Sequence, residues 1–284
     1  MARRVLDKVA DIMAAIYLSK VFQKLFRPVI DFVYRTYERI LTKQISGGSI
    51  PRHVAIIPDG NRRWARLRGA SPADGHSQGY ERLKEVLNWL YELGIKVVTV
   101  YAMSTENCLY RPEDEKKHLF ELAKRGLKEL IENGTIDKYK VRVKVIGDLS
   151  LVPEDVRKII REVEEYSSKY NERYLNIALC YGGRRDIVEA IKKLIADVRR
   201  GIISESEIDE TVVSKYLSTS HLNEFSEPDL VIRTSGELRI SNFLLWQIAY
   251  SELYFCDVLW PEFRKIDLLR AIRSYQRRER RFGR

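Results

Sequence analysis

Six short apolar runs alternate along the chain with longer amphipathic stretches. The runs are rich in β-branched residues, as buried strands are, whereas the stretches between them carry apolar residues at helical spacing. The expected strands are 54–57, 97–103, 141–147, 175–181, 229–234 and 253–258. The expected helices are 76–93, 113–132, 154–170, 186–200 and 267–281. This alternation predicts an α/β fold with a six-stranded, mainly parallel sheet flanked by helices.

The composition fits a folded body with an anionic partner. The chain has 284 residues, 45% hydrophobic and 32% charged, which is enough to bury a core and argues against disorder. Its 50 Lys and Arg against 40 Asp and Glu give a net charge of +10. That excess favours polyanions, diphosphates or an anionic membrane surface without choosing among them. A nucleic-acid partner is not expected, because the strands lack patches of interleaved aromatic and basic residues.

The first 45 residues have a helical and basic pattern of their own. Apolar residues recur at helical spacing in 1–45, and "SGGSIP" at 46–51 separates this extension from a body at 50–284. The amphipathic extension would either lie on a membrane surface or pack on the body, and the pattern leaves both open. No signal peptide is expected, and no apolar run approaches the roughly 20 residues that span a bilayer. A cytoplasmic protein, in peripheral contact with the membrane at most, is therefore predicted.

The three cysteines carry no recognisable motif. Cys108, Cys180 and Cys256 lie far apart and form no CxxC pair. We therefore expect neither a disulfide framework nor a zinc site, and a reducing environment.

"IIPDGNRRWA" at 56–65 places chemically distinctive residues just after the first expected strand. Gly60 would let a ligand approach the backbone, and the amides of residues 60–63, reinforced by Arg62 or Arg63, would bind a phosphate group. Asp59 would repel that phosphate unless a divalent cation lay between them, and Mg²⁺ commonly bridges a carboxylate and a diphosphate. The alternative is an ordinary turn that caps a helix.

Polar residues follow other strands as well. "RTSGELRISN" at 233–242 offers Arg233, Arg239 and Ser241 for a second diphosphate, since guanidinium groups bind phosphate oxygens in pairs. "STEN" at 104–107 is either a helix cap or a loop that orients a substrate. Glu252 is the single carboxylate in the nearly uncharged run 241–255, which fits a structural ion pair as well as a metal ligand.

Several motifs together resemble the cis-prenyltransferases, the family of undecaprenyl and dehydrodolichyl diphosphate synthases, and the archaeal type in particular. They are HVAIIPDGNRRWA, GHSQG, YAMSTEN, IGD, CYGGRRDIV, VIRTSGELRISNFLLWQIAYSELYF and RERRFG. The resemblance implies a Mg²⁺-dependent homodimer that condenses isopentenyl diphosphate repeatedly onto farnesyl or geranylgeranyl diphosphate, with cis double bonds. The product would be a long polyprenyl diphosphate, a precursor of glycosyl carrier lipids.

The resemblance also implies roles for individual residues. Asp59 would handle Mg²⁺ and the diphosphate, with Glu252 beside it at the metal. Asn107 matches a position sometimes described as a proton acceptor, but a carboxamide is a poor base, so an orienting role is expected. The implied allylic-diphosphate residues are Gly60, Asn61, Arg62, Arg63, Trp64 and His76. The implied isopentenyl-diphosphate residues are Arg233, Arg239, Ile240 and Ser241. Ser104, Thr105, Glu106 and Arg111 match a mobile substrate-binding loop, and Arg281 and Gly283 match an ending that reaches the partner's site.

An apolar tunnel is a further implication. Two expected helices, 76–93 and 113–132, would wall it, although each of these residues could equally be ordinary core. The candidate residues are Leu83, Val86, Leu87, Leu90, Leu119, Leu122, Leu127 and Ile131.

The chain departs from the family pattern at two places. Pro72 stands where an Arg is common, so that Arg66 or Arg68 would have to substitute. Cys108 replaces an aromatic residue, and Arg111 lies one place further from Asn107 than usual. An alternative function, that of a non-catalytic partner subunit, is disfavoured because the 59–63 segment is intact.

Overall fold

The computed structural model describes residues 20–278, and the side chains from residue 28 onward. The chain divides into two compact units, residues 1–48 and 49–284. The described part of the first unit is one helix, α2 (Lys20–Ile45), which contains Pro28. The part of the predicted extension before Lys20 lies outside the described residues. All the strands found within residues 20–278 belong to the second unit.

A six-stranded sheet forms the centre of the second unit. Its strand order is β3-β4-β2-β1-β5-β6, and every neighbouring pair is parallel, which confirms the predicted fold class. The strands are β1 (His53–Ile57), β2 (Val97–Tyr101), β3 (Val141–Ile146), β4 (Arg173–Ala178), β5 (Leu230–Arg233) and β6 (Glu252–Phe255). All five residues of β1 and of β2 are buried, as expected for central strands covered on both faces.

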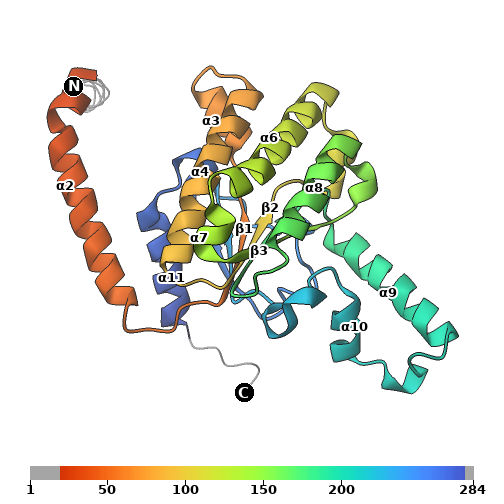
Figure 1. Cartoon of the computed structure of the whole chain (residues 1–284). Helices are drawn as coiled ribbons and strands as arrows, with labels where there is room; N and C mark the ends of the chain where they lie inside the picture. Colours follow the sequence, from red (N-terminus) through yellow and green to blue (C-terminus); the bar gives the residue numbers. More distant parts are fainter. Residues whose placement is uncertain (1–19, 279–284) are drawn as a thin grey trace, which may run out of the picture. The chain divides into compact units, whose positions relative to one another are not determined.

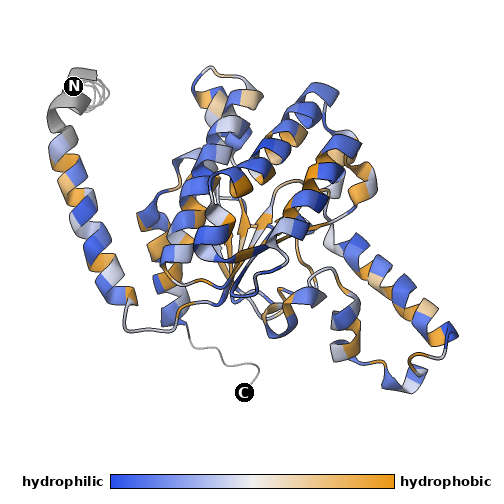
Figure 2. Ribbon diagram, in the orientation of Figure 1, coloured by the Kyte–Doolittle hydropathy of each residue, from blue (hydrophilic) through white to orange (hydrophobic). Residues whose placement is uncertain are grey.

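Helices cover the sheet, and in Figure 1 α4, α6 and α8 lie together on one side of it, away from α9 and α10. The α-helices are α3 (Asn61–Leu67), α4 (Pro72–Glu92), α5 (Thr105–Tyr110), α6 (Glu113–Glu132), α7 (Thr135–Tyr139), α8 (Glu154–Ser167), α9 (Gly183–Arg199), α10 (Glu210–Tyr216) and α11 (Lys265–Arg277). Short 3₁₀ turns are η1 (Leu149–Leu151), η2 (Glu205–Glu207), η3 (Ser220–Phe225) and η4 (Trp260–Glu262). Figure 2 shows orange strands between helices that carry both orange and blue residues, which is the pattern that burial of one helix face requires.

Three of the expected strands extend past the carboxyl ends that the structure gives them. β2 ends at Tyr101 rather than 103, β4 at Ala178 rather than 181, and β6 at Phe255 rather than 258. After β2, the amides of Ala102 and Met103 both donate to the Ala178 carbonyl, so the chain turns there instead of continuing the ladder. These turns place polar loops at the carboxyl edge of the sheet.

None of the helices within 20–278 is long and apolar enough to cross a bilayer.

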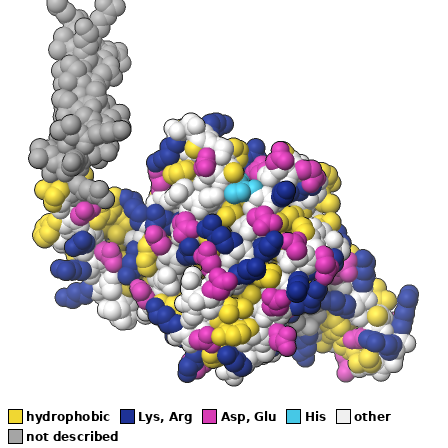
Figure 3. Space-filling model, turned by 45° about the horizontal axis from the view of Figure 1, so that its top comes forward, with side chains coloured by type: hydrophobic (Ala, Val, Ile, Leu, Met, Phe, Trp, Pro, Cys, Tyr) yellow, Lys and Arg dark blue, Asp and Glu magenta, His cyan; other side chains and the backbone are white. Residues whose placement is uncertain are grey.

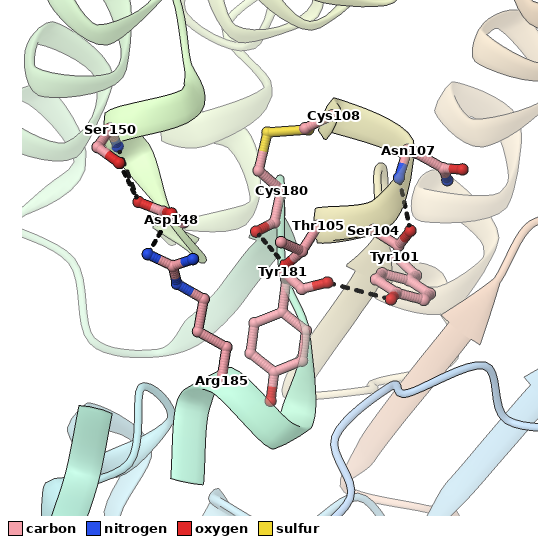
Figure 4. Close-up of a disulfide and its surroundings, with 10 residues drawn as sticks. All are labelled: Tyr101, Ser104, Thr105, Asn107, Cys108, Asp148, Ser150, Cys180, Tyr181 and Arg185. Carbon is pink, nitrogen blue, oxygen red and sulfur yellow. Dashed lines mark hydrogen bonds and ion pairs between the residues drawn. A yellow bond between two sulfur atoms is a disulfide. The ribbon is translucent and has the colours of Figure 1, made fainter. Parts of the chain in front are cut away.

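The expectation that the cysteines stay unpaired is wrong, because Cys108 and Cys180 form a disulfide (Figure 4). They are 72 residues apart in sequence, yet their Cα atoms lie 5.6 Å apart. Cys108 lies in the helix that follows β2 and Cys180 follows β4, and these two strands are neighbours in the sheet. Sequence spacing alone does not reveal this proximity, since it depends on the strand order. Cys256 is a free thiol.

His53 is part of a polar network within the sheet. Its side chain is fully buried, with Nδ1 2.8 Å from the Phe225 carbonyl oxygen and Nε2 2.7 Å from Thr99 Oγ1. A carbonyl can only accept, so Nδ1 carries the proton and Nε2 accepts from the threonine hydroxyl. Burial lowers the pKa of His53 from 6.5 to about 4.

This buried imidazole predicts a loss of stability in mild acid. The unfolded chain binds a proton at His53 below pH 6.5, whereas the native chain does so only near pH 4. The contribution of neutral His53 to the free energy of unfolding is therefore complete above pH 6.5. It falls by about 3 kcal/mol as the pH drops to 4. Urea unfolding between pH 4 and 8 should show this slope, and His53→Asn should reduce it. An equal slope in both proteins would contradict the assignment.

Candidate active site

A large cavity opens at the carboxyl edge of the sheet. It has a volume of about 1450 Å³ and is lined by residues that follow β1, β2 and β5 together with residues of α4 and α6. Its polar lining includes Asp59, Asn61, Arg62, Arg63, Arg66, His76, Ser104, Glu106, Asn107, Arg111, Arg233, Ser241 and Asn242, and also Tyr80, Lys84, Asn88, Tyr101, Glu129, Asn133, Thr135, Lys138 and Tyr139. Its apolar lining includes Leu83, Leu87, Leu119, Leu122, Leu127, Leu130, Val145, Leu175, Ile177 and Leu179. One cavity thus joins a strongly cationic end to a wall that carries many aliphatic side chains.

Asp59 is held at the cationic end by contacts with β5 and the loop after it. Its amide donates to Thr234 Oγ1 at 2.9 Å, and its carbonyl accepts from the same hydroxyl at 2.7 Å. Arg233 Nη2 donates to Asp59 Oδ2 at 2.6 Å. The Asp59 side chain is 35% exposed, and no contact among the described residues uses Oδ1. One carboxylate oxygen is therefore available to a ligand.

Arg233 is the buried cation of the site. It is 3% exposed, and its Nη1 donates to Ser241 Oγ at 2.7 Å and to the Arg239 carbonyl. The Nε atom is buried without a partner among the described residues. Guanidinium, hydroxyl and carboxylate thus converge where β1 and β5 end. Arg239 itself pairs with Glu237 at 2.6 Å and is 67% exposed.

The α3 segment contributes a second group of cations. Gly60 adopts a φ of 107°, and an added Cβ would lie 3.0 Å from both Leu259 and Ser235, so the backbone here requires glycine. Arg63 donates to the Ser235 carbonyl at 2.8 Å and to Glu237 at 2.9 Å. Arg62 is largely exposed. The Asn61 side chain turns back to the Pro58 carbonyl at 3.2 Å.

Glu115 on α6 joins the imidazole of His76 to the guanidinium groups of Arg111 and Arg62, and sequence reasoning missed it. Its Oε1 lies 2.8 Å from His76 Nε2, 2.6 Å from Arg111 Nη1 and 3.9 Å from Arg62 Nε. Burial lowers the pKa of His76, while its hydrogen bond to Glu115 acts in the opposite direction. The spacing of Arg111 and Glu115, four residues apart near a helix start, is the signal that could have revealed this contact.

The 104–107 segment begins α5 and borders the cavity. Ser104 caps the helix by accepting from the Asn107 amide at 3.0 Å. Glu106 accepts from Asn242 at 3.1 Å. Ser104, Glu106 and Asn107 line the cavity, whereas Thr105 is buried behind it and donates to the Cys180 carbonyl. The segment is thus both a helix cap and part of the cavity wall.

Comparison with known proteins decides what this arrangement is. A family model described as "Putative undecaprenyl diphosphate synthase" matches residues 57–283. The chain belongs to the cis-prenyltransferase family. It is therefore a transferase of prenyl groups.

Curated relatives of this cis-prenyltransferase are about half identical to it. A tritrans,polycis-undecaprenyl-diphosphate synthase (GGDP specific) from Sulfolobus acidocaldarius is 51% identical over 90% of this chain and 97% of the relative. A geranylgeranyl-diphosphate-specific synthase of the same name from Methanopyrus kandleri is 50% identical over 93% and 96%. The predicted resemblance, including its archaeal type, is confirmed.

Solved structures agree on the fold. Lavandulyl diphosphate synthase from Lavandula x intermedia, crystallised with dimethylallyl diphosphate, matches with a TM-score of 0.79 and 38% identity, over 83% of this chain and 99% of its own. A "probable undecaprenyl diphosphate synthase" from Campylobacter jejuni matches with a TM-score of 0.67 and 33% identity, over 83% and 100%.

Some residues expected at the cis-prenyltransferase site lie off the cavity lining. Trp64 packs under Arg68, whose guanidinium carbon lies 4.4 Å from the ring centroid. Ile240 packs on the buried core formed around Tyr101 and Phe243. Arg281 and Gly283 lie outside the described residues.

Glu252 does not join Asp59 within the chain. It begins β6 and pairs in register with Leu230, whereas Arg233, beside Ile57 and hence Asp59, pairs with Phe255. Three strand residues separate the two ends, roughly 10 Å along the sheet. Glu252 instead accepts from Arg278 at 2.6 Å. In this structure Glu252 therefore forms an ion pair and does not share a metal site with Asp59. The reason is that Glu252 lies at the amino end of β6, whereas Asp59 follows the carboxyl end of β1.

One of the two arginines considered as substitutes at the Pro72 departure lies on the cavity. Pro72 begins α4, behind a Ser71 cap, and lines the cavity. Arg66 also lines the cavity, whereas Arg68 stacks on Trp64 and pairs with Glu262. Of the two arginines considered from the sequence, Arg66 is the one that borders the site.

Five of the eight residues expected to wall an apolar tunnel line the cavity. Leu83, Leu87, Leu119, Leu122 and Leu127 line the cavity. Val86 and Leu90 are fully buried core residues instead, and Ile131 is absent from the lining. The alternative of ordinary core therefore holds for two of the eight, Val86 and Leu90, whereas Ile131 is partly exposed.

A magnesium ion fits this donor set only together with a substrate. Among residues 20–278 no cluster of three or more His, Cys, Asp or Glu side chains could hold a metal by itself. Mg²⁺ is commonly bound by one or two carboxylates plus substrate phosphates, and Asp59 offers an unpaired oxygen among cations suited to phosphate. The residues fit such a substrate-borne ion, and Asp59 would be its protein ligand.

Proposed function

We propose that this protein elongates an allylic prenyl diphosphate by repeated condensation with isopentenyl diphosphate, leaving each new double bond cis. The observation that carries the proposal is the single cavity in which Asp59 lies between two groups of cations, next to an apolar interior of suitable size. Geranylgeranyl diphosphate is the proposed starter, because the relatives at about 50% identity are named as specific for it. The product would be a polyprenyl diphosphate that serves as a precursor of a glycosyl carrier lipid.

The allylic diphosphate is assigned to the α3 side of the cavity. Arg62, His76 and Arg111 converge there on Glu115, which holds their side chains close together before a ligand arrives. The first amides of α3 have no intrahelical partners and add donors for phosphate oxygens. Since α3 has only seven residues, we assign most of the attraction to the side-chain cations.

Isopentenyl diphosphate is assigned to the β5 side. Arg233 and Ser241 already face the cavity, and Arg239 is an exposed cation that can exchange Glu237 for a phosphate. A bound Mg²⁺ would neutralise diphosphate charge, with Asp59 as its protein ligand. The Asp59 contact with Arg233 would then give way to the two phosphates.

The reaction follows from this placement of charge. The C–O bond between the allylic carbon and its diphosphate breaks as positive charge develops on carbon, and the cations stabilise the departing anion. The isopentenyl double bond attacks that carbon, and the new intermediate loses a proton to restore a double bond. The departing diphosphate can accept this proton. Asn107, whose carboxamide is a poor base, orients the substrates.

The apolar interior retains the growing chain. Burying each five-carbon unit contributes roughly 3 to 4 kcal/mol, at about 0.8 kcal/mol per CH₂. The wall leucines of α4 and α6 provide the surface for this burial. The alternative of a non-catalytic subunit finds no support, because Asp59 and both cation groups are present.

The proposal is tested by product analysis. Purified protein is incubated with labelled isopentenyl diphosphate, Mg²⁺ and primers of 10, 15 and 20 carbons, and the dephosphorylated products are sized. We expect a ladder of five-carbon additions, most efficient with the 20-carbon primer. Incorporation best supported by a shorter primer would overturn the choice of starter, and no incorporation with any primer would overturn the function.

We also propose that the enzyme is a homodimer, associated through α9. Val188, Ile191 and Ile195 share one face of this helix, and each is between 45% and 48% exposed. Ile191→Glu should weaken dimerisation about 10- to 100-fold, because a buried isoleucine contributes about 1.5 to 3 kcal/mol. Light scattering over a dilution series measures this, with Lys193→Glu on the other side of α9 as the control. An unchanged dimer would exclude this surface.

Peripheral membrane contact is the proposed role of the N-terminal extension. Val29, Phe32 and Val33 of α2 are exposed apolar side chains on a basic helix, which suits the interface of an anionic bilayer. Deleting residues 1–45, or introducing Phe32→Glu with Val33→Glu, should abolish co-sedimentation with anionic liposomes. Unchanged binding of both variants would remove the membrane role.

A further inference from the structure

The Cys108–Cys180 disulfide lies beside the cavity, on a segment that lines it. Cys108 is in the middle of α5, next to Asn107 and three residues before Arg111. Both of those residues line the cavity. Figure 4 shows the bond running from α5 to the chain just after β4. Its α5 end, Cys108, is on the same segment as Ser104 and Asn107.

The first residues of α5 are already tied to the sheet by hydrogen bonds. The Thr105 amide donates to the Tyr181 carbonyl at 3.0 Å, and the Tyr181 amide donates to the Met103 carbonyl at 3.1 Å. Thr105 Oγ1 also donates to the Cys180 carbonyl at 3.0 Å. These bonds, and the one that Glu106 accepts from Asn242, hold the first half of α5.

The second half of α5 has little other support. Leu109 is 46% exposed and Tyr110 is 80% exposed, so neither apolar side chain packs firmly on the body. The Arg111 amide bonds within the segment to the Asn107 carbonyl, and the Arg111 side chain meets α6 through Glu115. A helix of six residues is not stable by itself. Within the described residues, Cys108 is the point at which this half is fastened to the sheet.

The other end of the bond is a rigid anchor. Cys180 is fully buried, and its carbonyl accepts from both Thr105 Oγ1 and the Asp148 amide. Tyr181, the next residue, belongs to the core and lies edge-on to Phe243. The disulfide thus fixes a weakly packed active-site helix to one of the firmest parts of the structure.

We propose that this disulfide is a positioning element for the reaction: it holds α5 so that Asn107 and Arg111 meet the allylic diphosphate in a preformed arrangement. Without the disulfide, α5 samples other arrangements. The apparent affinity for the allylic diphosphate then falls in proportion to the fraction of molecules whose α5 is still in the binding arrangement. If about a tenth to a third remain competent, KM for the allylic diphosphate rises about three- to tenfold, with a smaller change in kcat. The kinetic part of this inference rests on the proposed function.

The test compares the native protein, the Cys108→Ala/Cys180→Ala variant and a Cys256→Ser control. Thiols are counted by alkylation and mass spectrometry after unfolding, since Cys256 is half-buried in the native state. We expect one alkylated cysteine without reductant and three after treatment with dithiothreitol. The reductant supplies two electrons and two protons to the S–S bond and leaves as its own cyclic disulfide. Three free thiols in the untreated protein would overturn the proposal.

Kinetics and hydrogen exchange then examine the positioning role. The double variant and the reduced native protein should share the rise in KM for the allylic diphosphate, while Cys256→Ser shows none. Dithiothreitol should not affect the double variant further. Amides 106–111 should exchange faster in the double variant, and equal exchange or an unchanged KM would contradict the role. Thiol counts and exchange need no turnover, so they decide the matter even if the proposed function fails.

Discussion

Replacing Asp59 with Asn should lower kcat/KM for prenyl transfer by about 10²- to 10³-fold, because the carboxylate proposed to hold the Mg²⁺–diphosphate loses its charge. The magnitude is that expected for removing one preorganised electrostatic group from an active site. The amide keeps the size of the side chain and can still accept from Arg233, so the fold should be retained. Initial rates of isopentenyl incorporation at varied Mg²⁺ measure the effect.

The matched control for this variant is Asp114→Asn. Asp114 is an exposed acid in the first turn of α6 and does not line the cavity. Its replacement should leave the rate within about twofold. An Asp59→Asn enzyme that elongates prenyl chains at the native rate would remove Asp59 from the chemistry.

Arg233→Lys should be nearly as damaging as Arg233→Ala, with losses in kcat/KM of about 10²-fold or more. The native guanidinium contacts Asp59, Ser241 and the Arg239 carbonyl at once, and a single ammonium group cannot reproduce that fork. Both variants should raise KM for isopentenyl diphosphate more than KM for the primer, because Arg233 is assigned to the β5 side.

Separate titration of the two substrates measures this difference. Arg142→Lys, at an exposed position of β3, is the control and should be neutral. Asp59 is 35% exposed, so breaking its pair with Arg233 should cost less stability than the 3 to 5 kcal/mol of a fully buried pair. A lysine variant with the native KM for isopentenyl diphosphate would show that Arg233 does not bind that substrate.

Local pattern was enough to predict the sheet and its helices. The expected helix 113–132 coincides with α6, where Pro112 precedes three acidic residues in the first turn and gives a clear start signal. The polar ends of β1, β2 and β5 were also predictable, since the carboxyl ends of parallel strands meet at one edge. Asp59, Arg233 and Ser241 do meet there.

Features that depend on strand order and register could not be predicted from the sequence. Glu252 follows an uncharged run in the manner of a buried functional acid, yet its register opposite Leu230 places it at the far end of β6. Cys108 and Cys180 become neighbours only because β2 and β4 are adjacent. The role of Glu115 could not be recognised, because α6 carries many charged residues and most of its acidic side chains are solvent-exposed.

The surface shows why net charge alone did not reveal the function. In Figure 3 Lys and Arg side chains are interspersed with Asp and Glu over the described face, with hydrophobic side chains among them, instead of forming one basic patch. The cations that matter are those gathered at the end of the cavity.

A crystal structure with isopentenyl diphosphate, Mg²⁺ and a non-reactive thio analogue of geranylgeranyl diphosphate tests the central claim most directly. We predict the allylic head beside Arg62 and His76, the isopentenyl head on Arg233 and Ser241, and the Asp59 carboxylate on the metal ion. The prenyl tail should lie between α4 and α6. A tail outside this cavity, or an Asp59 that still faces Arg233 with both substrates bound, would contradict it.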